Sequence, residues 1–100
     1  MNNELSQPVI VCAACRPPET QITIVGPRHC DTVMRHQLVY VQLALPHIRS
    51  FAGWEQGFID QHGTFYDRRA AMIIAKAAGQ KIDMKRNGGD PDVLYSEGLY

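Results

Sequence analysis

Residues 67–79, DRRAAMIIAKAAG, carry the most regular pattern in the chain and set the kind of fold. Asp67 has the side chain of a helix N-cap, and Gly79 can take the left-handed conformation in which helices often end. The polar stripe between them holds only Arg69 and Lys76. The pattern therefore predicts a helix over 68–78 that is covered on several sides, in the core or at a subunit interface.

A second helix is predicted from Asp31 or Thr32 to about Leu45, where Pro46 stops it. Its polar side chains are expected to form a solvated face: Arg35, Gln37 and Gln42. Apolar residues recur in it at spacings of three and four: Met34, Leu38, Val41 and Leu45. This spacing predicts an amphipathic helix with one buried stripe.

Short runs rich in β-branched and aromatic residues flank the two helices. Segments 9–14 and 20–25 are predicted to form the two strands of a hairpin. Pro17 and Pro18 are expected in the connection, because proline cannot donate the hydrogen bonds that pair strands. Segments 57–60 and 64–66 read as a second hairpin around Gly63. Together these elements predict an α+β fold in which a small antiparallel sheet packs with two main helices.

The end of the chain carries three further predictions. Segment 80–85 is expected to form a last short strand, and 87–91, with two glycines and a proline, a turn-rich loop. Segment 93–100 holds Leu94, Tyr95, Leu99 and Tyr100. A tail with that much apolar surface is expected to dock on the core.

Length and composition exclude several classes of protein. One hundred residues with 45% apolar side chains make one domain, 1–100, with one modest core. Ten basic residues balance ten acidic ones, which excludes a binder that holds long nucleic acid through overall positive charge. No apolar run approaches the roughly 20 residues that span a membrane. A cytoplasmic protein without a membrane partner is expected.

The cysteines give little support to metal or disulfide chemistry. Three cysteines, an odd number, fit a reducing compartment. Cys12 and Cys15 form a CxxC, but a strand would point them to opposite faces, and no second ligand pair follows for zinc. We expect no metal and no cofactor, and keep a zinc-holding interaction domain as an alternative.

Candidate binding residues carry positive charge or an aromatic ring. Arg28 and His29 precede a predicted helix start, where backbone N–H groups and the helix dipole attract anions such as phosphate. His29 with Asp31 is also a candidate base and orienting acid, although no hydrolase motif surrounds them. Aromatic residues can stack on a nucleobase while basic ones meet its phosphates. These candidates include Phe58, Phe65, Arg68 and Arg86.

The order of several short motifs resembles a known family. The motifs are GPRHCD at 26–31, EQGFID at 55–60, GTFYDRR at 63–69, IAKAAGQ at 74–80 and LYSE at 94–97. In this order and spacing the chain is similar to the first family of phage-encoded Thoeris anti-defence proteins, the cyclic-nucleotide sponges. The similarity covers the chain from about residue 20 to its end.

The resemblance implies a protein that performs no catalysis. Its members bind glycocyclic ADP-ribose, and in some cases cyclic di- and trinucleotides, and sequester these bacterial immune signals in the cytoplasm of the infected host. They assemble as dimers and hexamers, with pockets where subunits meet. Carried onto this sequence, Phe58 stacks on adenine, Arg86 meets the diphosphate, and Arg28 and His29 serve other phosphates. A small enzyme that hydrolyses such nucleotides, using His29 and Asp31, is the alternative.

Overall fold

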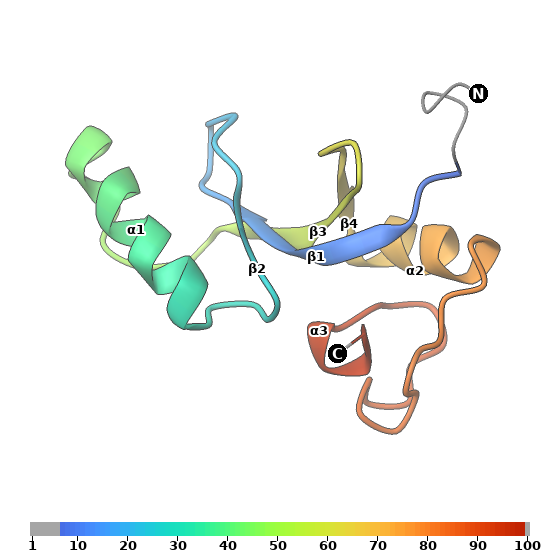
Figure 1. The fold of residues 1–100 in the computed structure, drawn as a ribbon. Coiled ribbons are helices and arrows are strands. Elements are labelled where there is room, and N and C mark those ends of the chain that lie inside the picture. Colours follow the sequence, from blue (N-terminus) through green and yellow to red (C-terminus); the bar gives the residue numbers. More distant parts are fainter. Residues whose placement is uncertain (1–6, 100) are drawn as a thin grey trace.

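The computed structural model describes residues 7–99 and confirms the α+β class (Figure 1). One antiparallel sheet of four strands has the order β2-β1-β3-β4. Two main helices and a short C-terminal one accompany it. The elements are β1 (Ile10–Arg16), β2 (Ile24–Gly26), α1 (Thr32–Ala44), β3 (Glu55–Asp60), β4 (Phe65–Asp67), α2 (Arg68–Ala77) and α3 (Ser96–Leu99).

Both predicted hairpins form, and β1 and β3 pair at the centre of the sheet. Ala13 lies opposite Gly26 in β2 and opposite Phe58 in β3. The prediction that the second strand spans 20–25 was too long at its start, since β2 begins at Ile24. The Thr20 hydroxyl there donates to the Pro17 carbonyl and accepts the N–H of Ile22, so local bonds replace a strand ladder.

Helix α1 has the predicted bounds, with Asp31 as N-cap, and its predicted stripe faces inward, where Met34 and Val41 are buried. It packs beside β2, at one end of the molecule (Figure 1). The opposite side was predicted to be a solvated polar face, which is wrong in part. We define the outer α1 face as the four large apolar side chains exposed there: Val33 (49%), Val39 (54%), Tyr40 (73%) and Leu43 (75%).

Gln37 fastens α1 to the outer strand. Its side-chain oxygen accepts the N–H of Val25 at 2.9 Å, and its side-chain nitrogen donates to the Val25 carbonyl. Val25 lies in β2, which stands at one edge of the sheet. A residue predicted to face solvent therefore pairs with the backbone of that edge strand.

Helix α2 begins and ends as its caps predict. Asp67 accepts the N–H of Ala70, and Gly79 takes a φ of +71° after the last turn. Ala71, Met72 and Ala75 are buried, but Ile73 is 68% exposed. We expected other parts of the protein to cover α2 on several sides. Within the described chain only the side of α2 that faces the sheet is covered, and the opposite side faces outward.

The core lies between one face of the sheet and the helices. Facing residues of paired strands share a side, so Ala13, Cys15 and Phe58 point into it, and each is 0% exposed. Residues 93–99 dock there as predicted, with Leu94 also 0% exposed and its N–H bound to the Arg68 carbonyl, while Tyr100 of the predicted tail lies outside the described residues.

The predicted strand over 80–85 is wrong, since residues 80–89 form irregular backbone and turns. The Gln80 side chain instead accepts the N–H of Ile10 at 2.7 Å and donates to the Ile10 carbonyl at 2.9 Å. One side chain thus satisfies the two groups that a neighbouring strand would have paired. The predicted turn-rich loop follows, and Gly88 and Gly89 both have a φ of +81°.

Candidate functional site

Arg68, one of the predicted site residues, starts α2 and is held over the C-terminal segment. Its Nη2 donates to the side-chain oxygen of Gln56 in β3, and its guanidinium carbon lies 4.8 Å from the centre of the Tyr95 ring. The Nε atom is buried without a hydrogen-bond partner in the described chain. Within residues 7–99 no carboxylate forms an ion pair with this guanidinium. Arg68 is therefore a positioned cation that forms no ion pair with a carboxylate of the described chain.

Tyr95, whose ring Arg68 contacts, lines a pocket of about 350 Å³, although Arg68 is not itself one of the lining residues. We call it the Tyr95 pocket. Tyr95 is 37% exposed, so part of its ring can meet a ligand. The pocket is lined by Arg86, Asn87, Gly88, Asp90, Tyr95 and Glu97. Of the predicted site residues, Arg86 thus lines the pocket together with Tyr95, and Arg68 contacts the Tyr95 ring.

The loop between α2 and α3 builds this pocket around a buried amide. Asn87 is 1% exposed; its Nδ2 donates to the carbonyls of Asp90 and Val93, and its Oδ1 accepts the N–H of Tyr95 at 2.7 Å. Gly98 packs against it so closely that an added Cβ would lie 2.6 Å from the Asn87 side chain. These contacts fix the position of Tyr95.

His29 lies near the same cluster but is committed to backbone contacts. Its Nε2 is 2.7 Å from the Gly57 carbonyl oxygen, and its backbone N–H donates to the Ser96 hydroxyl. Burial above all lowers its pKa, and the charge of Arg68 adds to that, while the Gly57 carbonyl and Glu97 act in the opposite direction. His29 is thus a half-buried group that joins β3 to α3.

Phe58 and Phe65 lie on opposite faces of the sheet. Phe58 is 0% exposed and meets the His29 ring edge-on, with 5.1 Å between ring centres. Stacking of Phe58 on adenine, as predicted, would require this packing to open. Phe65 carries the guanidinium of Arg16 at 4.0 Å from its ring centre, and Arg16 pairs with Glu55. The structure therefore does not bring Phe65 together with Arg68 and Arg86.

The predicted anion site at the start of α1 is occupied by a side chain of the protein. Asp31 Oδ1 accepts the N–H of Met34 at 2.9 Å, and Oδ2 accepts the N–H of Arg28 at 3.1 Å. A carboxylate in this position uses N–H groups that a phosphate would need and adds negative charge. Asp31 is thus used as a cap, and no hydrogen bond joins it to the His29 ring.

The cysteines are all free, and the CxxC is divided as predicted. Cys15 is fully buried, whereas Cys12 lies on the other face of β1 and is half-buried. The described part of the chain contains no group of three or more His, Cys, Asp or Glu residues placed to hold a metal. The zinc alternative for Cys12 and Cys15 therefore gains no further ligands from residues 7–99.

Four residues of the site were not among the predicted ones: Gln56, Asn87, Tyr95 and Glu97. Tyr95 and Glu97 belong to the LYSE motif at 94–97, so the signal that could have found them was present. Asn87 could be expected only in a turn, since nothing local marks a buried amide. Gln56 directly precedes the strand predicted from Gly57, and its uncharged side chain gives no sign of a binding role.

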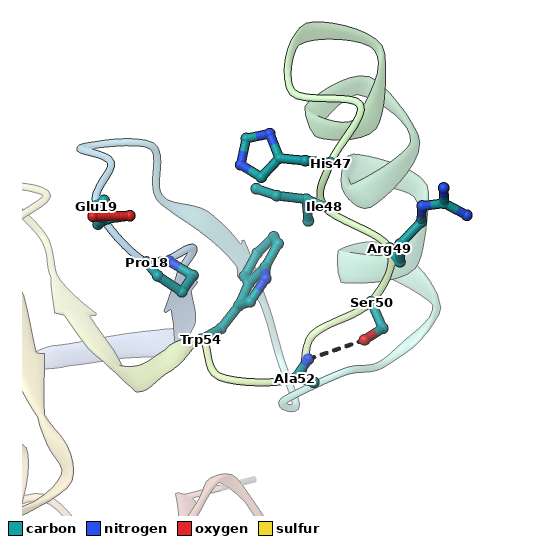
Figure 2. A pocket seen from close by; sticks show the side chains of 8 residues that line it. All are labelled: Pro18, Glu19, His47, Ile48, Arg49, Ser50, Ala52 and Trp54. Carbon is teal, nitrogen blue, oxygen red and sulfur yellow. Dashed lines mark hydrogen bonds between the residues drawn. The ribbon is translucent and has the colours of Figure 1, made fainter.

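A second pocket, of about 230 Å³, lies between the β1–β2 connection and residues 47–54 (Figure 2). Ile48 and Trp54, each 7% exposed, give it an apolar wall. Glu19 and His47 stand on either side of its mouth, and Arg49 points away from it. None of the predicted site residues lines this pocket.

Comparison with known proteins identifies a family. Residues 9–100 match the family model described as phage T4 y16D protein, so almost the whole chain is covered. No curated protein and no solved structure matches. Among the described residues, no helix has the length and apolar character that crossing a membrane requires. The phage origin expected from the sequence is thus confirmed, and the chain belongs to the phage T4 y16D protein family.

Proposed function

We propose that this phage protein binds bacterial immune signalling nucleotides, glycocyclic ADP-ribose or cyclic di- and trinucleotides, and sequesters them uncleaved in the cytoplasm of the infected host. The observation that carries the proposal is the guanidinium of Arg68. It has a buried Nε without a partner and no ion pair in the described chain, and it lies against the ring of Tyr95, a residue that lines the Tyr95 pocket. Such a group suits a phosphate ligand.

The residues in and next to the Tyr95 pocket favour a nucleotide as ligand over a bare anion. The exposed part of the Tyr95 ring offers a surface on which adenine can stack, a role for which the buried Phe58 is poorly placed. Arg68 and Arg86 then serve the phosphates, while Glu97 can accept hydrogen bonds from ribose hydroxyls. Base, sugar and phosphate thus each have a matching group.

The state of His29 and Asp31 favours binding over hydrolysis. A general base must reach its substrate, and its orienting acid must hold it there. His29 is bound to the Gly57 carbonyl, and the Asp31 carboxylate caps α1. To work as a sink the protein needs nanomolar affinity, about −12 kcal/mol.

The outer α1 face supports the expected homodimer or hexamer. It places four large apolar side chains side by side on a helix that carries one arginine and no acid. Association through this face should be lost in the double variant Tyr40→Asp, Leu43→Asp. Size-exclusion chromatography with light scattering should give a monomer for that variant, and the wild-type size for Ile73→Asp, which changes an exposed residue of α2. A monomeric wild type would contradict this part of the proposal.

Isothermal titration with glycocyclic ADP-ribose, and separately with a panel of cyclic di- and trinucleotides, tests the function. The ligand recovered after heat denaturation is then identified by mass. Nanomolar binding with intact ligand supports sequestration. Recovery of a cleaved product would support the hydrolase instead, and absence of binding to every member of the panel would overturn the proposal.

Matched variants test the site. Arg68→Gln should weaken binding at least tenfold, while Arg69→Gln, which removes the same charge from the neighbouring exposed position, should leave affinity unchanged. Tyr95→Ala should lose about 1 to 3 kcal/mol of binding free energy, and Tyr95→Phe should keep the stacking. Circular dichroism of each variant checks folding. Equal losses for Arg68→Gln and Arg69→Gln would remove the Tyr95 pocket from the function.

A further inference from the structure

The pocket of about 230 Å³ between the β1–β2 connection and residues 47–54 has an aromatic and apolar wall (Figure 2). We call it the Trp54 pocket. The indole of Trp54, which is 7% exposed, stands there between Pro18 and Ile48. Sites for drug-sized ligands measure roughly 300 to 1,000 Å³, so this pocket suits a smaller molecule.

The loop that carries Trp54 holds the indole in place. The Trp54 backbone N–H donates to the Phe51 carbonyl at 3.1 Å, and the Phe51 ring meets the indole edge-on, with 5.0 Å between ring centres. In the same loop the Ser50 hydroxyl oxygen accepts the N–H of Ala52 at 3.2 Å (Figure 2). The indole is therefore a preorganised surface, which a ligand does not have to order when it binds.

Glu19 supplies a negative charge at the mouth of this pocket. Its side chain is exposed and forms no ion pair with residues 7–99. Its backbone has a φ of +61°, a strained conformation for a residue with a Cβ, which persists where the surroundings enforce it. Glu19 is the one acid among the described residues that line the pocket, and Arg49 points away from it (Figure 2). The charge at the mouth therefore favours a cationic ligand.

The lining groups favour a quaternary ammonium over a primary one. A primary ammonium brings three N–H donors that need acceptors. Here Glu19 offers the one carboxylate, and Pro18 and Ile48 present only carbon side chains. A quaternary ammonium has no N–H to satisfy, and tryptophan is the aromatic residue that attracts such a cation most strongly.

We propose that the Trp54 pocket binds a small soluble cation through a quaternary ammonium group. The methyl groups of the cation lie against the indole of Trp54, and the Glu19 carboxylate balances its charge. Binding forms no covalent bond. The proposal does not depend on the nucleotide site.

The test is a titration of the isotope-labelled protein with choline, followed by NMR spectroscopy. The chain contains one tryptophan, so its single indole N–H signal reports on this pocket. We expect a saturable shift of that signal, with one choline per chain and a dissociation constant of about 1 mM or below. Two other probes should bind about fivefold more weakly or less: ethanolamine, and the neutral analogue of choline in which a tert-butyl group replaces trimethylammonium.

Three variants separate the charge of Glu19 from other effects. Glu19→Gln should weaken choline binding about fivefold, because it removes the charge nearest the ligand. Asp92→Asn, which removes a charge from an exposed position between α2 and α3, should leave the affinity unchanged. Arg49→Gln, in the lining of the pocket, should not weaken binding, because its side chain points away.

Several results would overturn the site. One is the absence of a saturable indole shift, and another is equal affinity for choline and its neutral analogue. Unchanged affinity in Glu19→Gln would remove the carboxylate from the site, and a loss in Arg49→Gln would indicate an anion in place of a cation. Sedimentation with phosphatidylcholine vesicles without binding of free choline would assign the group to a lipid surface. Circular dichroism of each variant confirms that folded proteins are compared.

Discussion

Asn87 holds Tyr95 in place by accepting its backbone N–H at 2.7 Å while lying almost wholly out of solvent. Replacing Asn87 with Ala leaves this N–H and the carbonyls of Asp90 and Val93 without their partner. Because unsatisfied buried groups cost about 1 to 3 kcal/mol each and are not fully additive, we expect a loss of about 3 kcal/mol. Urea unfolding measures it. The control is Lys85→Ala, at an exposed site of the same loop, which should change stability by less than about 0.5 kcal/mol. Similar losses in the two variants would contradict the role given to Asn87.

Gly57 cannot carry a side chain in this sheet. An added Cβ would lie 2.0 Å from the Tyr66 carbonyl oxygen and 2.7 Å from the Phe65 ring. Since the first contact is with backbone, Gly57→Ala should cost about 3 kcal/mol or more and should displace β4. At Gly63 no atom lies within 4 Å of an added Cβ, so Gly63→Ala should cost only its left-handed strain, about 1 to 2 kcal/mol. Thermal unfolding of the pair checks this order, and a reversed order would contradict the packing of β4 on β3.

The two helix caps should differ in strength. Asp67→Ala removes one bond, to the Ala70 N–H, and should cost about 1 kcal/mol. Asp31→Ala removes bonds to Met34 and Arg28 together and should cost about 2 kcal/mol. Chemical denaturation of both variants in parallel measures the difference. Equal losses would mean that the bond to Arg28 contributes nothing.

His29 should make stability depend on pH. Burial holds the pKa of His29 below its usual value, so the unfolded chain binds the proton more tightly than the folded one. Its contribution is therefore present above the unfolded pKa, about 6.5, and is lost as the pH falls through the lower folded value. The free energy of unfolding should fall as the pH drops below about 6.5, and His29→Gln, which keeps a donor for the Gly57 carbonyl, should flatten that fall. The same slope in both proteins would assign it to other groups.

Both helices and both hairpins could be predicted because their signals are local. Asp31 and Asp67 each accept the backbone N–H of the residue three positions ahead, in the first turn of the helix that they cap. Gly63 takes the positive φ of its turn, which is also a local property. The strand predicted over 80–85 was wrong because the conformation there is set by a distant contact. Its conformation depends on Gln80 reaching Ile10, seventy residues away, and no pattern within the segment reveals that contact.

The cations of the candidate site could be predicted from the sequence, whereas the contacts that arrange them could not. Arg68 and Arg86 stood out as cations with a planar donor group, whereas Phe58 was assigned to a ligand from its motif although it fills the core. Whether an aromatic ring faces a pocket depends on which face of the sheet the helices cover. That choice rests on packing between segments far apart in the chain, and it placed Tyr95, not Phe58, at the surface.

The pairing of Gln37 with Val25 closes part of a sheet edge to other strands. Strands with free edges recruit strands from other molecules and build continuous sheets and fibres. Since the N–H and the carbonyl of Val25 are both taken, β2 offers an incoming strand no ladder at this residue. Gln37→Ala frees both groups of Val25, so a chain with this substitution should add strands at this edge, and polymerise, more readily than the wild type.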